Sequence, residues 1–378
     1  MPKQIRFSPL TTLTAICRSL GTGVALAILA LALTGCTGDQ PADDLPEHLL
    51  LKDFDPVSVY QVPRTAVKRA KYPVIDVHSH PRADSEAEIA RWVTLMDRMN
   101  IQKTIIMTYA TGARFDSIYA LYSQYPDHFD VWCGFDYTGY DQPGYGPAAV
   151  AELERCVQVG ATGVGELGDK GKGLFYGDPQ AWGMHPDDPR MDPLFEKCAE
   201  LGLPVNIHVA DPYWMYLPMD EKNDGLMNAY KWRLDNQEGI VDHAGMIDIL
   251  QRTVERHPRT TFIACHFANC SYDLSKIGAL LDACPNLYVD NGARYSETAA
   301  IPRAAKQFYT RYQDRILYGT DMGFSESMYE ITFRILETRD EHFYSDFFSY
   351  HWPLYGIDLE DVVLKKVYGD NARRVLNL

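Results

Sequence analysis

The stretch that decides the fold is Val74-Ile75-Asp76-Val77-His78-Ser79-His80, in which two histidines lie two residues apart at the end of a short apolar run. In a β-strand, residues i and i+2 point to the same face. Both imidazoles can therefore reach one point in space, as a pair of metal ligands must. The stretch predicts a strand that ends in a metal-binding HxH motif.

Four further candidate ligands each end an apolar, strand-like run later in the chain. They are Glu166, His208, His266 and Asp321. A parallel barrel brings the C-terminal ends of its strands to one mouth, so these side chains would meet the two histidines there. Imidazole and carboxylate ligands suit Zn²⁺ and its neighbours, whereas Ca²⁺ needs more oxygen. The pattern predicts one divalent-metal site, best suited to Zn²⁺, that holds one or two ions.

Strand-like and helix-like segments alternate from Tyr72 to the end of the chain. Apolar runs fall at 74–78, 103–108, 130–135, 162–166, 204–209, 261–266, 287–290 and 316–320. Amphipathic stretches lie between them at 86–98, 147–159, 192–202, 241–256, 272–283 and 298–312. Eight strands with intervening helices predict an α/β fold, a (β/α)8 TIM barrel in a single domain over 72–378. The alternative is an open doubly wound sheet, but the glycine fingerprint usual after its first strand is missing.

The first 35 residues have the features of an export signal. A basic start is followed by an apolar stretch from about 24 to 33 and by Leu33-Thr34-Gly35-Cys36. The apolar stretch is shorter than the roughly 20 residues that span a bilayer. Small residues before a cysteine resemble the lipobox of bacterial lipoproteins, which implies processing before Cys36 and lipidation of its thiol. An ordinary secretory signal is the alternative.

We therefore expect a signal peptide over 1–35, a polar, proline-punctuated segment over 36–71 that is a tether or an irregular wrap, and then the barrel. The protein would be exported and linked to a bacterial membrane only through its lipid, facing the periplasm from the outer membrane in a Gram-negative cell. The net charge of −15 argues against nucleic acid as a partner. Cysteines after Cys36 show no CxxC spacing, and several lie in apolar runs, so buried free thiols are favoured over disulfides.

Several motifs carry a resemblance to a known family. They are Asp76-Val77-His78-Ser79-His80, His208, His266, Tyr318-Gly319-Thr320-Asp321 and the ending Gly369-Asp370-Asn371-Ala372-Arg373-Arg374-Val375-Leu376. The chain from Tyr72 to Leu378 resembles the amidohydrolase superfamily of metal-dependent TIM-barrel enzymes, and most closely its amidohydrolase-2 group. That group includes decarboxylases and lactone hydrolases, so the resemblance implies fold and metal site and leaves the substrate open.

Gly165-Glu166-Leu167-Gly168 departs from many members of that group and resembles the strand-four glutamate motif of TatD-like deoxyribonucleases and phosphotriesterase-like proteins. There such a residue can bridge two metals. The resemblance implies one metal held by His78, His80, Glu166 and Asp321, and a second held by Glu166, His208 and His266. Without the bridge, His78, His80, His208 and Asp321 would hold a single metal, and His266 would be a catalytic group. The alternative for Glu166 is an ion pair with a base such as Lys170.

The expected chemistry follows from the metal. Bound Zn²⁺ lowers the pKa of water to about 7 and polarises a substrate carbonyl. Asp321 can take the proton as general base and later pass it to the leaving group, and a metal-free His266 could stabilise the oxyanion. Asp76 either orients the two histidines or packs in the barrel core.

We predict a metal-dependent hydrolase of a small ester, lactone or amide. The alternatives are a non-oxidative decarboxylase, which is a carbon–carbon lyase, and a non-catalytic binding lipoprotein. Glu166 favours hydrolysis, because a second metal helps to activate water. The full set of ligands argues against the binding protein.

Substrate-binding candidates are fewer and less specific. Arg294, after the seventh strand, could clamp a carboxylate, which would make the small-molecule substrate anionic. Lys170 and Asn269 are further polar candidates. For each of the bases Arg294 and Lys170, a surface salt bridge is an equally good explanation. Tyr213 and Trp214, in the long stretch 211–240, could stack on a ring. A second aromatic-rich stretch, 340–357, could form a substrate wall or lid over the barrel mouth, but we expect it to pack against the barrel or to form a subunit interface in a homo-oligomer.

Overall fold

The computed structural model describes residues 46–378, and eight parallel strands form its barrel. These strands are β1 (Val74–Ser79), β2 (Ile101–Met107), β3 (Phe129–Trp132), β4 (Val164–Asp169), β7 (Val205–Val209), β8 (Phe262–Ala264), β9 (Leu287–Asp290) and β10 (Ile316–Leu317). Hydrogen bonding joins β1, β2 and β3 in one run and β4, β7, β8, β9 and β10 in another, each in chain order. Cys36 and the predicted signal lie outside the described residues.

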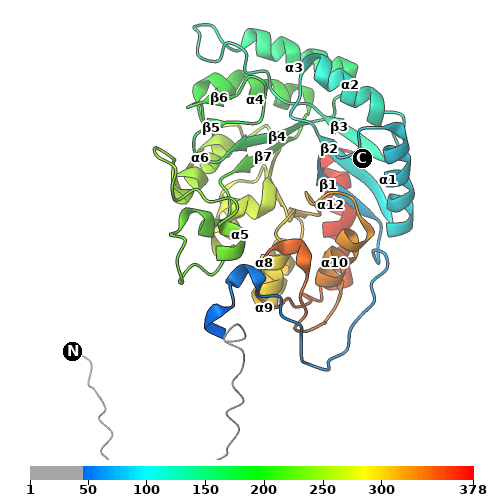
Figure 1. The fold of residues 1–378 in the computed structure, drawn as a ribbon. Helices are drawn as coiled ribbons and strands as arrows, with labels where there is room; N and C mark the ends of the chain where they lie inside the picture. Colours follow the sequence, from blue (N-terminus) through cyan, green and yellow to red (C-terminus); the bar gives the residue numbers. More distant parts are fainter. Residues whose placement is uncertain (1–45) are drawn as a thin grey trace, which may run out of the picture. The chain divides into compact units, whose positions relative to one another are not determined.

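Two contacts close the ring. A parallel bridge between Cys133 and Val164 joins β3 to β4. The Val77 amide donates to the Tyr318 carbonyl oxygen at 2.9 Å, which joins β1 to the end of β10. Figure 1 shows the strands surrounded by helices. The predicted (β/α)8 barrel is therefore confirmed.

The outer layer consists of amphipathic helices. They are α1 (Glu86–Met99), α2 (Gly112–Tyr122), α3 (Pro147–Val159), α4 (Asp192–Leu201), α6 (His243–Arg256), α7 (Leu274–Ala283), α9 (Pro302–Arg311) and α10 (Glu326–Glu337). In α1, the buried residues Ile89, Trp92 and Met96 recur at the three- and four-residue spacing of one helix face. The sequence pattern predicts helices between the strands and after the eighth strand, but it gives no bounds for α2 or α10.

Where one continuous helix was expected over 298–312, the chain forms two. Helix α8 (Tyr295–Ala300) ends before Ile301, whose backbone is not helical, and α9 begins at Pro302. Proline has no amide hydrogen to donate and is favoured at the first position of a helix. The proline therefore starts a new helix and ends the previous one.

Shorter elements complete the fold. A hairpin of β5 (Gly173–Leu174) and β6 (Ala181–Trp182) extends β4, and α5 (Leu226–Ala229) lies in the long connection after β7. The 3-10 segments are η2 (Pro46–His48), η3 (Leu51–Asp53), η4 (Pro189–Met191), η5 (Tyr213–Tyr216), η6 (Cys265–Asn269) and η7 (Asp346–Phe348). The C-terminus is α11 (Asp361–Lys365), a π-turn η8 (Lys366–Asp370) and α12 (Asn371–Leu376).

The described chain divides into a unit that ends at Phe54 and a compact unit over 55–378. Within the larger unit, residues before β1 bind the barrel: the Thr65 amide donates to the Asp340 carboxylate at 2.9 Å, and the Ala70 amide to the Met99 carbonyl at 3.1 Å. Across 46–378, no helix is long and apolar enough to cross a membrane.

The barrel interior is a packed core at one end. Apolar side chains from β1, β2, β8 and β10 form one buried cluster there, and Ala372 of α12 belongs to it. The six cysteines of the described chain are free and buried, as the sequence pattern indicated. Polar groups gather at the other end of the barrel, where the strands end.

Candidate metal centre

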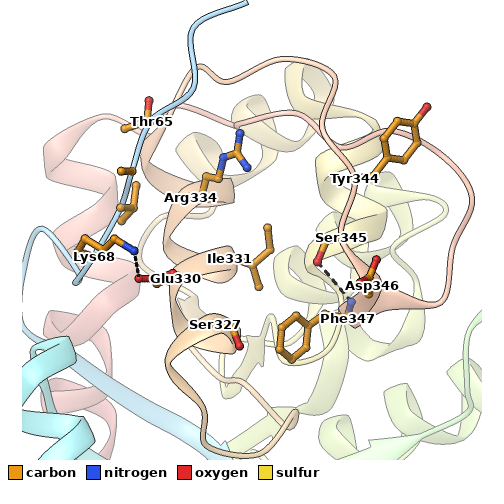
Figure 2. Close-up of a pocket in the computed structure, with 12 residues that line it drawn as sticks. Thr65, Lys68, Ser327, Glu330, Ile331, Arg334, Tyr344, Ser345, Asp346 and Phe347 are labelled. Atoms are coloured by element: carbon orange, nitrogen blue, oxygen red, sulfur yellow. Dashed lines mark hydrogen bonds and ion pairs between the residues drawn. The ribbon is translucent and has the colours of Figure 1, made fainter. Parts of the chain in front are cut away.

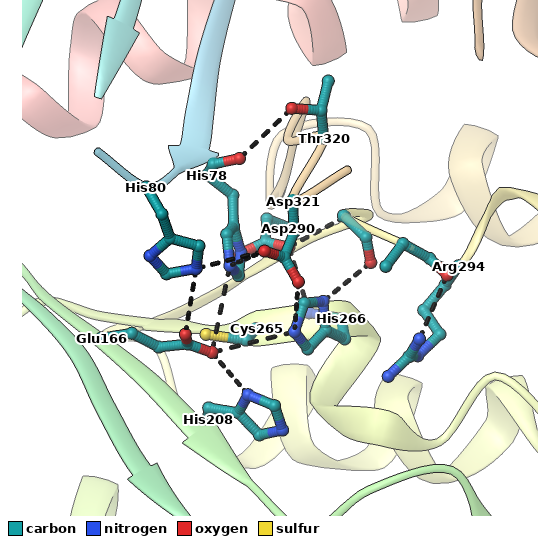
Figure 3. A network of polar contacts seen from close by, with 12 residues as sticks. His78, His80, Glu166, His208, Cys265, His266, Asp290, Arg294, Thr320 and Asp321 are labelled. Atoms are coloured by element: carbon teal, nitrogen blue, oxygen red, sulfur yellow. Dashed lines mark hydrogen bonds and ion pairs between the residues drawn. The ribbon is translucent and has the colours of Figure 1, made fainter. Parts of the chain in front are cut away.

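All six predicted ligands meet at the C-terminal ends of the strands. His78 is in β1, with His80 just after it, Glu166 is in β4 and His208 in β7, whereas His266 and Asp321 follow β8 and β10. Figure 3 shows their side chains converging. Among these six residues, three groups have ligand atoms within 4.8 Å of one another: His78, His80 and Glu166; Glu166, His208 and His266; and His78, His266 and Asp321. A fourth group in the described chain joins His78 to Cys265 and Asp290.

Glu166 lies between the histidines. Its Oε1 is 2.5 Å from His208 Nδ1 and 3.8 Å from His266 Nε2, and its Oε2 is 3.4 Å from His80 Nε2. Lys170, the predicted alternative partner, is instead 2.9 Å from Asp211. Burial opposes ionisation of Glu166, but the histidines around it, His208 foremost, hold its pKa well below the usual range.

Each histidine directs one ring nitrogen into the cluster and hydrogen-bonds through the other. The outer contacts are His78 Nδ1 to Asp290 Oδ2 at 2.9 Å, His80 Nδ1 to the Met107 carbonyl at 3.0 Å, His266 Nδ1 to the Gly292 carbonyl at 2.8 Å, and His208 Nε2 to Asp211 Oδ1 at 3.2 Å. Carbonyl and ionised carboxylate oxygens only accept, so the outer nitrogens of His78, His80 and His266 carry the proton in the neutral rings. The inner nitrogens of these three rings then carry lone pairs, as metal ligation requires. Both ring nitrogens of His208 face carboxylates, because its Nδ1 also hydrogen-bonds to Glu166 Oε1.

His78 gives the clearest indication of a bound metal. Its Nε2 is buried and has no hydrogen-bond partner within residues 46–378. Burying a polar atom without a partner costs about 1–3 kcal/mol in proteins. A divalent cation at this point would satisfy the nitrogen, and the residues present therefore fit the predicted metal.

The electrostatics of the cluster differ from one histidine to the next. Burial lowers the pKa of His78, but the carboxylates of Asp290 and Asp321 outweigh it and raise that pKa to about 9. Burial, with Arg294 and His78 close by, lowers the pKa of His266 to about 3, so this ring is neutral at pH 7. Because metal ligation needs neutral imidazole, binding would replace the proton on His78.

His266 does not end its strand as predicted. Strand β8 stops at Ala264, and His266, Phe267 and Ala268 all have left-handed backbones with φ between 51° and 59°. Non-glycine residues in this region cost about 1–3 kcal/mol each and persist where surrounding contacts hold them. The His266 amide donates to Asp290 Oδ1 at 3.0 Å, which is one such contact.

Asp76 is fully buried in the barrel, as one of its two predicted roles requires, and it makes no hydrogen bond to an imidazole ring in the described chain. Its Oδ1 accepts from the amides of His78 at 3.1 Å and Thr320 at 3.0 Å, and its Oδ2 from the Thr320 hydroxyl at 2.7 Å. Burial raises the pKa of Asp76 to about 7. Asp76 therefore joins the backbone of β1 to the segment that carries Asp321.

Sequence reasoning missed two carboxylates beside the ligands. Asp290 binds the His78 ring and the His266 amide, and Asp211 binds the His208 ring. Asp290 has the signal that revealed the ligands, an acidic residue at the end of a strand-like run. Asp211 has only its position three residues after His208.

A cavity of about 550 Å³ opens over the cluster. Its lining includes the predicted residues His80, Lys170, His208, His266, Arg294 and Asp321. Three other substrate candidates lie outside that lining. Tyr213 stacks on Tyr272 at 4.4 Å between ring centroids, Trp214 packs against Trp352, and Asn269 is fully buried behind Arg294.

Other aromatic residues form the walls of the cavity. They are Tyr109, Tyr176, Trp232, Phe347, Phe348 and Tyr350. Tyr109 and Tyr176 stack at 4.9 Å. The expectation that 340–357 serves only for packing or an interface is wrong for 347–350, because the segment after α10 passes over the mouth. Its remainder does pack, as in the contact of Trp352 with Trp214 at 6.2 Å between ring centroids.

A second hollow, of about 410 Å³, lies against α10 and is lined by 65–68 and 344–347 (Figure 2). An ion pair between Lys68 and Glu330, 2.8 Å apart, lies on its wall. None of the six metal-ligand candidates lines this hollow. The metal-ligand candidates that reach a cavity, which are His80, His208, His266 and Asp321, line the one at the strand ends.

The fold and the cluster together define a metal-dependent enzyme on a TIM barrel. The chain belongs to the amidohydrolase family, whose family model matches residues 75–378. No curated protein sequence matches the chain significantly.

Solved structures share the fold at low sequence identity. A 2,6-dihydroxybenzoate decarboxylase from Rhizobium is 17% identical, with a TM-score of 0.51 over 81% of this chain and 99% of its own. A 5-carboxyvanillate decarboxylase from Novosphingobium aromaticivorans, in complex with manganese and 4-hydroxy-3-methoxy-5-nitrobenzoic acid, is 16% identical, with a TM-score of 0.51 over 84% of this chain and 100% of its own. These likenesses support the barrel architecture.

Proposed function

We propose that the protein is a metal-dependent hydrolase of a small ester, lactone or amide. The position of Glu166 is the observation that carries this proposal. One carboxylate is shared by the group His78, His80 and Glu166 and the group Glu166, His208 and His266. Such an arrangement suits two divalent ions, and paired ions assist attack by water. Decarboxylation, by contrast, needs no attacking water.

The cofactor we propose is Zn²⁺, because imidazole and carboxylate ligands dominate the cluster. Manganese, present in the similar 5-carboxyvanillate decarboxylase structure, is the alternative. When bound, such ions polarise a carbonyl oxygen and lower the pKa of water. The remaining steps belong to side chains of the protein.

Asp321 is placed to move protons. It lines the cavity, and its side chain is 22% exposed whereas that of Glu166 is 1% exposed. Burial opposes its ionisation, but His78 and His80 hold its pKa below the usual range, so the carboxylate is ready to accept. We assign it the general-base role, with return of the proton to the leaving group.

We assign His266 to metal binding. Its Nδ1 donates to the Gly292 carbonyl at 2.8 Å, which leaves a lone pair and no proton on the Nε2 of the neutral ring. A nitrogen in this state can bind a cation. It cannot donate to an oxyanion, which was the role expected for His266 in a one-metal site.

Decarboxylation of a small aromatic acid is the second candidate. The solved structures similar to this chain include decarboxylases of 2,6-dihydroxybenzoate and 5-carboxyvanillate. The aromatic lining of the cavity is also compatible with a ring. This reading requires one metal, with Glu166 as a structural partner of the histidines.

The test combines a substrate screen with metal counting. Purified protein is offered lactones, esters and amides in one panel and aromatic carboxylates in another. The metal content of wild type, Glu166→Gln and the control Glu330→Gln is measured, because Glu330 is half-buried and belongs to none of the ligand groups. We expect hydrolysis, about two metals per chain, and loss of one metal with at least a 100-fold loss of rate in Glu166→Gln. Release of CO₂ without hydrolysis, together with unchanged metal in Glu166→Gln, would establish the lyase instead.

For location, we propose that a lipidated Cys36 holds the barrel at a membrane surface, with a tether that ends before Thr65, whose amide binds the barrel. The proposal rests on the sequence Leu33-Thr34-Gly35-Cys36 alone. Stable anchoring needs more than one acyl chain, and the multiply acylated cysteine of bacterial lipoproteins would meet that need.

A further inference from the structure

Arg294 stands apart from the other basic residues of the protein. Among the lysines and arginines of residues 46–378 it alone is buried, with 9% of its surface exposed. It follows β9 at the start of α8, and its side chain lines the cavity beside His266 (Figure 3). Charged groups are rarely buried unless they are paired, because desolvation of an unpaired charge is costly. The hydrogen-bond partners of Arg294 therefore indicate which kind of ligand the cavity binds.

Within residues 46–378, the Arg294 guanidinium donates only to neutral oxygens. Nη2 and Nε donate to Asn269 Oδ1 at 2.6 and 3.3 Å, and Nη1 donates to the carbonyl of Ala293 at 3.1 Å. Glu297 supplies the one carboxylate within 4.0 Å in the described chain, and its Oε1 is 3.8 Å from Nη1, beyond a hydrogen bond. The guanidinium charge thus lacks a hydrogen-bonded anion.

Glu297 is itself a poor counter-charge for Arg294. Its Oε1 accepts from the Tyr350 hydroxyl at 2.9 Å, and its buried Oε2 has no partner in the described part of the chain. Burial raises the pKa of Glu297 and outweighs the opposite effect of Arg294, so the site disfavours a negative charge on this carboxyl. The positive charge of Arg294 therefore remains available to a ligand.

The other two cations at the cavity are already satisfied. Lys170 Nζ lies 2.9 Å from Asp211 Oδ2. The Arg82 side chain is 45% exposed, so water solvates it, and its Nη2 is 3.4 Å from Asp321. Of the three cationic side chains that line the cavity, Arg294 is therefore the buried one whose charge is not neutralised.

Asn269 holds the guanidinium in place from behind. Its Nδ2 donates to the carbonyls of Val209 and Ala210 at 3.2 and 3.1 Å, which fixes the amide with Oδ1 toward Arg294. A fork held in one orientation before the ligand arrives loses little entropy on binding. Asn269, predicted as a substrate contact, is by this geometry a positioning residue.

We propose that Arg294 binds a carboxylate of the substrate, so that the enzyme selects small carboxylic acids whose scissile ester, lactone or amide bond reaches the metal cluster. Planar guanidinium and carboxylate groups match in a paired hydrogen-bond geometry. This inference rests on the proposed hydrolase function for the scissile bond, but the anion site itself is independent of the reaction.

The test measures binding first and turnover second. Benzoate is titrated calorimetrically into the full-length, metal-loaded protein and into Arg294→Met, Arg294→Lys and the control Arg252→Met, an arginine in an exposed ion pair with Asp187. We expect benzoate to bind wild type and the control equally, about 10- to 100-fold more weakly to Arg294→Met, and with an intermediate loss to Arg294→Lys. Unchanged thermal melting would show that the variants are folded.

Turnover then separates this inference from the proposed function. A lactone that bears a carboxylate is compared with its methyl ester at that carboxylate. Arg294→Met should raise KM for the acid about 10- to 100-fold and change KM for the methyl ester less than about threefold. Benzoate binding lost in Arg294→Met without any hydrolysis would keep the anion site and remove the hydrolase. Failure of wild type to bind benzoate, or equal binding by Arg294→Met, would overturn the anion site even if hydrolysis is found.

Discussion

Replacing Asp290 by asparagine should weaken divalent-metal binding by about 10- to 100-fold while the barrel stays folded. The Asp290 carboxylate has acceptor contacts on both oxygens. Oδ2 accepts from His78 Nδ1 at 2.9 Å, and Oδ1 accepts from the amides of His266 at 3.0 Å and Gly292 at 2.9 Å. Asparagine keeps the shape but has only one oxygen.

The expected loss of metal affinity depends on which hydrogen bond of the Asp290 side chain is lost in the variant. If the asparagine oxygen keeps the two amides, its NH₂ group faces the Nδ1–H of His78, and two donors then oppose each other. His78 can relieve this by moving its proton to Nε2, the buried nitrogen aimed into the cluster. The protonated Nε2 cannot bind a metal. His78 is then lost as a ligand unless its proton returns to Nδ1, which costs free energy because the Nδ1–H group opposes the NH₂ group of the introduced asparagine. Each tenfold loss of affinity corresponds to about 1.4 kcal/mol.

The assay is titration of Zn²⁺ into stripped protein against a competing chelator at pH 7, followed by circular dichroism. The matched control is Asp273→Asn, because Asp273 caps α7 through the Ser275 amide and belongs to none of the ligand groups. The control should bind metal as wild type does. A folded Asp290→Asn protein with wild-type metal affinity would refute the argument that Asp290 sets the tautomer of His78.

Two further predictions concern stability and location. Burial opposes ionisation of Asp340, but bonds from the Thr65 amide and hydroxyl and from Arg334 Nε outweigh it and lower its pKa from 3.8. A depressed folded-state pKa stabilises the protein above the unfolded value near 3.8, and this contribution is lost as pH falls through the folded-state value. Urea unfolding should therefore show Asp340→Asn about 1.5–3 kcal/mol less stable than wild type at pH 7, with a smaller difference below about pH 4; a pH-independent difference would contradict the charge argument. Cys36→Ser should move the protein from the membrane fraction to the soluble fraction and remove the lipid from its mass, and unchanged fractionation would disprove the lipid anchor.

Much of the centre could be predicted because strand ends are readable in a single sequence. The apolar run before His78 and the run before His208 have the length of a buried strand, and a parallel barrel brings such ends together. The same rule applies to Asp290, which ends β9 in the run Leu287–Asp290. The sequence does not identify the role of Asp290, because no local pattern distinguishes an acid that binds a metal from one that orients a metal-binding histidine.

Contacts between distant segments could not be predicted in this way. Sequence spacing does not show that 347–350, rather than Tyr213 and Trp214, lines the cavity, because loop paths depend on packing against other loops. The sequence also does not predict the neutral hydrogen-bond partners of Arg294, because they depend on the left-handed turn that places Asn269 behind it. Local periodicity carries no information about either.

The metal content of the purified full-length protein, set beside its activity, tests the central claim most directly. We predict about two divalent ions per chain. Activity should be lost when these ions are removed and should recover when Zn²⁺ is added back. His78→Ala and Asp321→Asn should each lower the metal content and abolish activity, because each removes a ligand from the cluster. A metal-free preparation with full activity would contradict the metalloenzyme reading.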